Sequence, residues 1–380
     1  MRIALLTEKY LPDIGGLAVS TERLARTLTA SQHDVEVFAP TTSQAAGNVT
    51  RTDQGGIVVH RVVAHKRTDD TLADWFSLLV ARHAETPFDL LHAYYVTQAG
   101  FVTTYAARHL GLPSIVSARG NDLDRAAFDP AKAAHVLYAL QNASAITANS
   151  RDLVRKAQAL APGREVTLIP NGIDATHFAP AARDAALVES LGVKNDQSII
   201  GFVGEARAKK GLATLLIAYR ELASRRPAAL LLIGGVRGGD DKDTLRVFQK
   251  QNPNLPVVVV PYVATESLPA YYNLLDVLAI PSLRDGSPNA LLEGMACERA
   301  VVATPVGGIP DAIRDHENGR LVPPGDPHAL AIAIGELLDD SSKRARLGQN
   351  ARATILREFT PQQELEGNRT IYRRLLRSAD

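Results

Sequence analysis

The sequence of 380 residues contains a single cysteine, Cys297. One thiol cannot form a disulfide within the chain, so a disulfide-stabilised secreted fold is excluded and a reducing compartment is expected. Cys297 lies among Leu291, Leu292 and Met295. These neighbours predict a small buried core residue rather than a nucleophile.

Strong net charge and long apolar runs are also missing. The formal net charge is +1, so no overall field would recruit nucleic acid. No apolar run approaches the roughly 20 residues that span a bilayer. The apolar start of the chain is soon followed by acidic and aromatic residues, which is typical of a buried first strand and not of a secretion signal. We expect a cytoplasmic protein without a nucleic-acid partner, and the oligomeric state stays open.

Short, continuous apolar runs are abundant, and hydrophobic residues make up 46% of the chain. Such runs suit strands that are covered on both faces, and helical patterns separate them. The runs occupy residues 2–7, 35–40, 57–62, 89–95, 114–119, 145–150 and 166–171, and then 199–204, 230–235, 257–262, 277–282, 300–304 and 319–324. Strand and helix therefore alternate twice, which predicts an α/β fold of two doubly wound, Rossmann-like domains. We predict domains at residues 1–180 and 181–360, with a final helix at 361–380 that packs back on the first domain.

The turns that follow the strands are the places to look for a site, because open parallel sheets bind ligands beyond the carboxyl ends of their strands. With two such domains, the cleft between them is the expected location. Gly15 and Gly16 precede a helix after the first strand, where backbone N–H groups favour an anion. A plain tight turn explains this glycine pair equally well. The dinucleotide pattern G-x-G-x-x-G is absent.

A second turn, after the strand that ends near Gly204, is basic. Arg207, Lys209 and Lys210 precede a helix, where cations oppose the helix dipole. An anion bound at this turn would remove the conflict, and a solvated basic turn is the alternative. The P-loop pattern is not matched, so ATP hydrolysis is not indicated.

A third turn follows the run at 277–282. Ser287 is a candidate N-cap and Pro288 a candidate first helical residue, which would leave N–H groups around Ser287, Asn289 and Ala290 available to a phosphate. Asp285 stands in the loop before this start.

Glu293 lies further along the same helix, in the apolar sequence ALLEGMA. A carboxylate without a partner would be costly there, so we expect it to accept hydrogen bonds from paired hydroxyls, as on a ribose. The alternative is that Asp285 and Glu293 are charges on a solvated helix start. The later glycines Gly307 and Gly308 are interpreted as a structural turn.

At these residues the sequence resembles glycosyltransferase family 4, a large group of retaining enzymes with the two-domain GT-B fold. The resemblance covers nearly the whole chain and is carried by IPNGID, VGEARAKKG and, most specifically, PSLRDGSPNALLEGMACERAVVATPVGGIPDAI. In this family two acids separated by seven residues contact the donor, and Asp285 and Glu293 keep that spacing. The resemblance implies retaining transfer of a hexose-type sugar from a nucleoside-diphosphate sugar to a hydroxyl acceptor, without a metal or a cofactor.

The resemblance also implies roles for single residues. Glu293 would hold the ribose, Asp285 the donor sugar and Lys210 the diphosphate. The implied catalytic residues are Arg207, Lys210 and Asp285, and the implied binding residues are Gly15, Gly16, Arg119, Gly204, Tyr262, Val263, Gly286, Ser287, Pro288, Asn289, Ala290, Leu291 and Glu293. Tyr262 and Val263 would face the base, which stays open among uracil, guanine and adenine, with UDP and GDP preferred.

Three positions depart from the family pattern. Asp285 replaces the usual glutamate, Glu205 replaces the arginine that usually follows the strand glycine, and Arg119 replaces the histidine before a glycine. We take Arg207 as the substitute for the missing arginine. Because an arginine cannot act as a base at neutral pH, Arg119 would bind hydroxyls or phosphate.

Other functions remain alternatives. Asp122–Asp124 reads Asp-Leu-Asp and would suit a metal-dependent transferase, while a nucleotide-sugar epimerase, a pyridoxal-dependent phosphorylase or a non-catalytic sensor of sugar nucleotides would share parts of the plan. The acceptor, whether carbohydrate, small molecule or lipid-linked, is expected on the first domain, near residues 97–101 and 119–125. The basic helix at 341–359 either lies on anionic lipid at the inner membrane face or is a solvated helix face.

Overall fold

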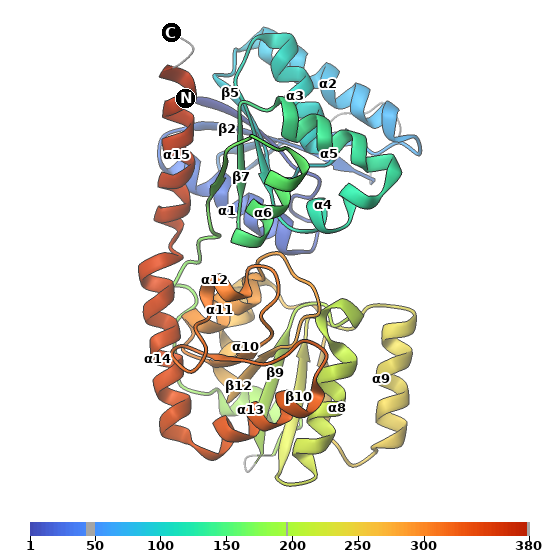
Figure 1. Cartoon of the computed structure of the whole chain (residues 1–380), viewed down its shortest axis with the longest axis vertical. Coiled ribbons are helices and arrows are strands. Elements are labelled where there is room, and N and C mark those ends of the chain that lie inside the picture. Colours follow the sequence, from blue (N-terminus) through green and yellow to red (C-terminus); the bar gives the residue numbers. More distant parts are fainter. Residues whose placement is uncertain (43–49, 195–196, 378–380) are drawn as a thin grey trace. The chain divides into compact units, whose positions relative to one another are not determined.

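The computed structural model describes residues 1–42, 50–194 and 197–377 (Figure 1). The chain divides into two compact units. The first runs from Met1 to Gly172 and takes in the C-terminal segment from Pro361, and the second runs from Ile173 to Thr360. The division falls before the predicted 180/181 boundary because Ile173 and Phe178, in the polar-looking linker, are buried in the core of the second unit.

The described part of the first unit has an eight-stranded sheet in the order β3-β4-β2-β1-β5-β6-β7-β8. Its strands are β1 (Arg2–Leu6), β2 (Asp34–Thr41), β3 (Thr50–Gln54), β4 (Ile57–Val63), β5 (Leu90–Ala93), β6 (Ser114–Ala118), β7 (Ala145–Ala148) and β8 (Val166–Leu168). Strand β3 pairs antiparallel with β4, and the other pairs are parallel. The apolar runs thus form the parallel sheet that the sequence predicts.

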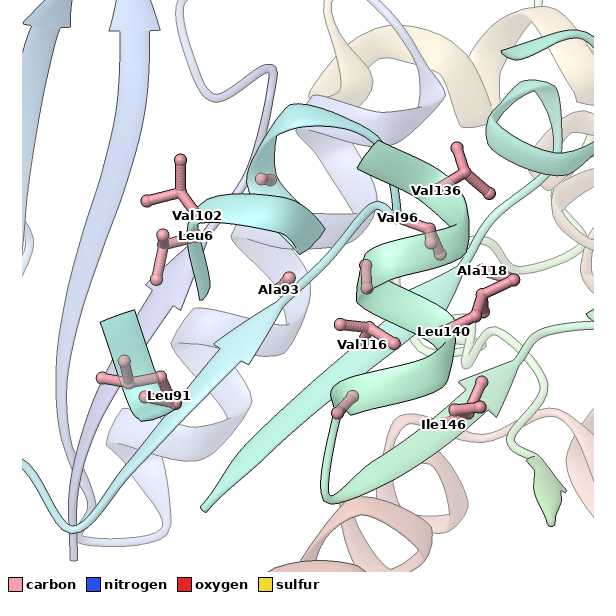
Figure 2. Close-up of a cluster of buried hydrophobic side chains, with 14 of the residues drawn as sticks. Leu6, Leu91, Ala93, Val96, Val102, Val116, Ala118, Val136, Leu140 and Ile146 are labelled. Atoms are coloured by element: carbon pink, nitrogen blue, oxygen red, sulfur yellow. The ribbon is translucent and has the colours of Figure 1, made fainter. Parts of the chain in front are cut away.

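Helices cover this sheet. They are α1 (Gly16–Ala30), α2 (Thr68–Glu85), α3 (Gln98–Leu110), α4 (Asn121–Asp124), α5 (Pro130–Asn142), α6 (Arg151–Leu160) and α15 (Pro361–Arg377), with a 3-10 turn η1 (Ala126–Phe128). Figure 2 shows Val136 and Leu140 of α5 beside Val116 of β6 and Ile146 of β7. These side chains are all but excluded from solvent, so the sheet gives rigid support to the turns at its carboxyl edge.

The last helix belongs to the first unit. Leu365, Ile371 and Tyr372 of α15 are buried in one cluster with Ile3 and Leu5 of β1. The helix that follows Pro361 therefore packs on the first domain, as the sequence predicts. Residues 378–380 of the predicted segment lie outside the described residues.

The second unit has a six-stranded parallel sheet, within the described residues, in the order β11-β10-β9-β12-β13-β14. Its strands are β9 (Ser198–Val203), β10 (Ala228–Ile233), β11 (Val257–Val260), β12 (Val277–Ile280), β13 (Ala300–Ala303) and β14 (Arg320–Leu321). Its helices are α7 (Ala185–Ser190), α8 (Leu212–Ala223), α9 (Asp240–Gln251), α10 (Leu268–Leu274), α11 (Asn289–Ala296), α12 (Ile309–Ala312), α13 (Pro327–Asp339) and α14 (Ser341–Glu358), with 3-10 turns η2 (Ala208–Lys210) and η3 (Thr265–Ser267). Among the helices described in both units, none is at once long enough and apolar enough to cross a bilayer.

The strand order fixes where each sheet can bind a ligand. In the second unit the chain builds outward from β9 to β11 and then returns to place β12 on the other side of β9. In the first unit the same reversal separates β1 from β5. Ligands of open α/β sheets bind at such switch points, beyond the carboxyl ends of the two strands. The turns after β9 and β12, and those after β1 and β5, are therefore the candidate sites.

Candidate functional site

An ion pair joins the turns that follow β9 and β12. Lys210, at the end of η2, donates from Nζ to Oδ2 of Asp285. The backbone supports the same contact, because the N–H groups of Leu283 and Arg284 donate to the Lys209 carbonyl at 2.9 and 3.2 Å. The Lys210 side chain is 21% exposed and that of Asp285 is 9% exposed. The structure thus brings two predicted site residues together at the switch point of the second sheet.

Several further contacts fix Asp285. Its Oδ2 accepts from Ser282 Oγ at 3.1 Å, and its Oδ1 accepts from the Gly286 N–H at 3.0 Å. Gly307 lies against the same turn with φ of +57°, and a Cβ at that position would stand 1.7 Å from the Asp285 carbonyl oxygen. Gly308 donates its N–H to the Gly286 carbonyl. The glycine pair at 307–308 therefore allows one turn to pack on another and does not merely reverse the chain.

The start of α11 differs from the sequence prediction. The helix begins at Asn289, Pro288 is the N-cap residue, and no side chain caps the helix. Pro288 has an extended ψ of 118°, so the helix starts one residue later than expected and Ser287 falls outside the cap position. Ala290 stands in the first turn of the helix, and the Leu291 side chain is buried in the core. At this turn the protein offers backbone N–H groups of the kind that bind phosphate.

Glu293 is held by a tyrosine that the sequence analysis did not identify. The Tyr272 hydroxyl donates to Glu293 Oε2 at 2.7 Å, and Glu293 is only 7% exposed. Burial, together with the nearby Glu293 carboxylate, raises the pKa of Tyr272 well above 10. The hydroxyl therefore remains a donor and orients the carboxylate. Tyr272 lies on α10, and its pairing with α11 has no local sequence signal.

The basic turn after β9 contains an internal acid. Arg207 Nη1 lies 3.2 Å from Glu205 Oε2, and Arg237 Nε lies 3.5 Å from the same oxygen. Gly204 directly follows β9 with φ of +116° and donates its N–H to the Ile233 carbonyl at 2.7 Å. Glu205, at the position where the family usually has arginine, therefore has two arginines as partners.

The segment expected to face a base follows β11. Tyr262 is 55% exposed, whereas Val263 is partly buried against the core of the second unit. The N–H groups of Gly234 and Gly235 donate to the Val260 carbonyl at 3.0 and 2.9 Å, which fixes the end of β11. An exposed aromatic ring thus stands on a well-supported turn.

The remaining predicted residues lie in the first unit. Gly15 has φ of +140° with no neighbour within 4 Å of an ideal Cβ, and Gly16 is the first residue of α1. Arg119 follows β6, and its guanidinium carbon lies 3.9 Å from the centroid of the Tyr94 ring. Its Nη2 also donates to Asn171 Oδ1. Arg119 is therefore held against two groups of its own unit.

The Asp-Leu-Asp sequence has a structural role. Oδ1 of Asp122 accepts N–H groups from Arg119 and Gly120 at 3.1 and 2.7 Å, and Oδ2 accepts that of Val96 at 3.2 Å. Burial, opposed by these amides, raises the pKa of Asp122 to about 6. Asp124 pairs with Lys156. Within residues 1–42, 50–194 and 197–377, no group of three or more histidine, cysteine or acidic side chains is arranged to hold a metal.

Glu8 is a second residue that the sequence analysis missed. It follows β1 at the switch point of the first sheet, and its Oε1 accepts from the Gln98 N–H at 2.8 Å and from the Thr97 hydroxyl. Burial raises its pKa, against the effect of these hydrogen bonds. The carboxyl group anchors the first turn of α3, within the segment 97–101. The sequence signal that could have identified Glu8 is an acidic residue in the turn after the first strand.

Two other predicted features concern the core and the surface. Cys297 is buried, and burial raises the pKa of its thiol to about 12, so the prediction of a core residue is confirmed. On the basic helix α14, Arg344 donates to the Leu337 carbonyl at 2.7 Å and Arg352 to the Phe178 carbonyl at 3.1 Å. These two arginines therefore hold α14 to backbone carbonyl groups of the second unit.

Two protein-family models match the chain. Residues 14–177 match "Glycosyltransferase Family 4", and residues 184–354 match "Glycosyl transferases group 1". The D-inositol 3-phosphate glycosyltransferase of Kineococcus radiotolerans is 30% identical, over 92% of this chain and 90% of that protein. The enzyme of the same name from Salinispora arenicola is 28% identical, over 90% of this chain and 83% of that protein.

Solved structures share the fold of the whole chain. Sucrose-phosphate synthase from Thermosynechococcus elongatus aligns with a TM-score of 0.83 at 23% identity, covering 99% of both chains. Anabaena HepE, solved in complex with UDP-glucose, aligns with a TM-score of 0.80 at 21% identity, covering 98% of this chain and 99% of that one.

Proposed function

This chain belongs to glycosyltransferase family 4, and from that membership we propose that it moves a hexose-type sugar from a nucleoside-diphosphate sugar to a hydroxyl acceptor, with retention of configuration and without a metal ion. A nucleotide-sugar donor is supported by the similar structures of Anabaena HepE that were solved with UDP and with UDP-glucose. Retention, the absence of a metal and the identity of the sugar are the new parts of this proposal.

One observation carries the proposal: Lys210 and Asp285 meet at the switch point between β9 and β12. A diphosphate there would receive the charge of Lys210 and of Arg207, and it would face the N-terminal end of α11. Asp285 would accept hydroxyls of the donor sugar. Glu293, oriented by Tyr272, would accept the ribose hydroxyls.

The chemical step follows from these charges. The bond from the anomeric carbon to the leaving phosphate oxygen breaks through an oxocarbenium-like state, and negative charge grows on the diphosphate. Lys210, Arg207 and the α11 amides stabilise that charge, which removes the need for a metal. The acceptor oxygen bonds to the anomeric carbon from the face that the phosphate leaves, and its proton passes to the leaving phosphate oxygen. The configuration is thereby retained.

The first unit is proposed to hold the acceptor. Its switch-point turns carry Glu8 and the segment 97–101, which offer acceptors and donors to sugar hydroxyls. The curated relatives are named for an inositol phosphate acceptor, which favours a polyhydroxyl compound. UDP is the proposed nucleotide, because two of the similar solved proteins hold UDP or a UDP-sugar, whereas one holds ADP.

The proposal is tested by incubating the purified chain with UDP-, GDP- and ADP-linked hexoses and a panel of polyol and glycoside acceptors, with and without EDTA. We expect release of one nucleoside diphosphate that depends on an acceptor and is unchanged by EDTA. Proton NMR of the product should show the anomeric configuration of the donor. Conversion of the donor without an acceptor, loss of turnover in EDTA or an inverted product would contradict the corresponding part of the proposal.

A further inference from the structure

Glu364 of α15 is a buried acid, and the hydrogen bonds described for its carboxylate come from residues of the first unit. Its Oε1 accepts from the Tyr94 hydroxyl at 2.7 Å. Its Oε2 accepts from the Gly172 N–H at 2.9 Å and from Arg23 Nε at 3.0 Å. The residue is 3% exposed. A carboxylate so deeply buried is expected to have a specific role for each oxygen, because an unpaired one would be strongly destabilising.

Each carboxylate oxygen of Glu364 contacts a residue that contacts Arg119 or lies next to one that does. The guanidinium of Arg119 lies 3.9 Å from the centre of the Tyr94 ring, and it donates to Asn171 Oδ1. Oε1 of Glu364 holds the hydroxyl of that same ring. Oε2 holds the N–H of Gly172, the residue directly after Asn171. A single carboxylate therefore fixes the ring that the guanidinium lies over and the residue next to the amide to which it donates.

The protonation states suit this arrangement. Burial favours the neutral form of Glu364, but the charges of Arg23 and Arg119 and the hydrogen bonds outweigh it and hold the pKa of this carboxyl below its usual value. Burial raises the pKa of Tyr94, so its hydroxyl stays protonated and donates. Asn149 adds a further hold, since its Nδ2 donates to Asn171 Oδ1 at 3.2 Å.

We propose that Glu364 is a positioning residue for the transfer reaction: through Tyr94 and the Asn171–Gly172 segment it sets the orientation of the Arg119 guanidinium toward the substrate. The C-terminal helix α15 is then part of the reaction site of the first unit and not only a clamp on its core. An arginine is long and flexible, so a guanidinium that is fixed in advance binds its target with less loss of freedom. This inference rests on the proposed function of the chain.

Hydroxyl deletions test the inference. Tyr94→Phe removes the contact with Glu364 Oε1 but keeps the ring under Arg119 and the pair between Glu364 and Arg23. We expect kcat to fall about five- to tenfold, the value that corresponds to one hydrogen bond. In an Arg119→Ala background, Tyr94→Phe should leave kcat unchanged, while its effect on the melting temperature should be the same in both backgrounds.

Tyr372→Phe is the matched control. Tyr372 lies on α15, as Glu364 does, and it is as deeply buried as Tyr94. Its hydroxyl contacts His92 Nδ1 at 2.8 Å, and no described hydrogen bond joins it to Arg119, Tyr94 or Glu364, although the His92 ring packs edge-on against that of Tyr94. This variant should lower the melting temperature and leave kcat alone. Glu364→Gln should reproduce the kcat effect of Tyr94→Phe, and if that variant does not fold, Tyr94→Phe decides the question.

Three results would overturn the inference. They are equal kcat losses from Tyr94→Phe in both backgrounds, a kcat loss in Tyr372→Phe as large as in Tyr94→Phe, and full activity in Arg119→Ala. The last result would leave the transferase function standing and remove only the role of Arg119. A wild-type chain that turns over no nucleotide sugar would instead remove the proposed function itself.

Discussion

The switch-point turns of the two sheets carry opposite charge. In the second unit the turns after β9 and β12 present Arg207 and Lys210, with Asp285 as the partner of the lysine. In the first unit the turn after β1 presents Glu8, whose partners are a hydroxyl and a backbone N–H. The same sheet plan therefore builds one edge that suits a diphosphate and another that suits neutral hydroxyls. Under the proposed function, charge at the switch point, and not topology, would separate the two roles.

The two units also share a buried pair of tyrosine and glutamate. Tyr94 donates to Glu364 and Tyr272 donates to Glu293, both at 2.7 Å. In the first pair Arg23 and a backbone amide also donate to the carboxylate, and the tyrosine ring lies under Arg119. In the second pair the carboxylate lies on α11, four positions after the first residue of that helix. One pair is proposed to orient another side chain, and the other to meet a ligand.

The largest expected effect is the loss of the cation in the second unit. Lys210→Ala should lower kcat/KM by about 10²- to 10³-fold, because the developing charge on the leaving diphosphate loses a fixed partner. Lys250→Ala, which removes the same charge from the exposed side of α9, should change kcat/KM less than about twofold. Initial rates at varied donor concentration measure both. A wild-type kcat/KM in Lys210→Ala would contradict the proposal that the turns of the second unit bind the diphosphate through their cations.

The second largest effect is expected from disturbing the contact between Gly307 and the Asp285 turn in the second unit. Gly307→Ala would place a Cβ 1.7 Å from the Asp285 carbonyl oxygen, so the turn must move or the variant must lose stability. We expect a loss of about 3 kcal/mol in free energy of unfolding, together with weaker donor binding.

Gly325→Ala is the control for Gly307→Ala. It has a similarly left-handed φ of +76° but meets only the Leu283 side chain, at 3.8 Å. It should cost about 1 kcal/mol, the cost of backbone strain alone. Denaturant unfolding of both variants distinguishes the clash from the strain, and equal losses would mean that the close approach to Asp285 is unimportant.

Acid should weaken the first unit through His92. Burial, reinforced by the charge of Arg119, lowers the pKa of His92 to about 3, from an ordinary value of 6.5. The folded state therefore keeps His92 neutral while the unfolded chain takes up a proton. Stability contributed above pH 6.5 is lost as the pH falls toward 3, at about 1.4 kcal/mol per pH unit, or about 2 kcal/mol between pH 6.5 and 5.

Unfolding measured across this pH range in wild type and in His92→Gln checks the prediction. The variant should be less stable at pH 7, because contacts with Ser117 and Tyr372 change, and its stability should depend less steeply on pH below 6.5. Parallel pH curves for the two proteins would show that His92 is not the group responsible.

The smallest expected effect concerns Tyr272. Tyr272→Phe removes the donor that orients Glu293, and the affinity for the nucleotide should fall about five- to tenfold. The test compares nucleoside diphosphates with their 2′-deoxy and 3′-deoxy forms. If Tyr272 acts through Glu293 on the ribose, the affinity lost on removing a ribose hydroxyl should be smaller in the variant than in wild type. An unchanged difference would mean that Glu293 does not contact the ribose.

Local sequence patterns were sufficient for the parallel strands and for the two C-terminal helices, α14 and α15. These patterns failed where contacts with residues distant in the sequence determine the local structure. Strand β3 (Thr50–Gln54) is a short polar sequence without a strand pattern, and it is a strand because it pairs with β4 at the edge of the sheet. The start of α11 was misplaced by one residue, since serine before proline is a common cap pattern and the extended Pro288 backbone is set by its surroundings.

The candidate site was predictable where chemistry follows a strand in the sequence. Lys210 and Asp285 were identified because each stands in a turn after an apolar run. Glu364 and Tyr272 were not, because their roles depend on partners far away in the chain: Tyr94 and Glu364 are 270 positions apart. Helical periodicity indicates that such residues face the core, but it does not indicate which group they meet there.

Isothermal titration calorimetry of the full chain with UDP, GDP and ADP tests the central claim most directly, in wild type, Lys210→Ala and Arg119→Ala. The account predicts that one nucleoside diphosphate binds wild type at a single site, that Lys210→Ala weakens its affinity by about tenfold or more, and that Arg119→Ala changes it less than about twofold. An absence of binding heat for all three nucleotides, or an equal loss of affinity in both variants, would contradict the assignment of the diphosphate to the second unit.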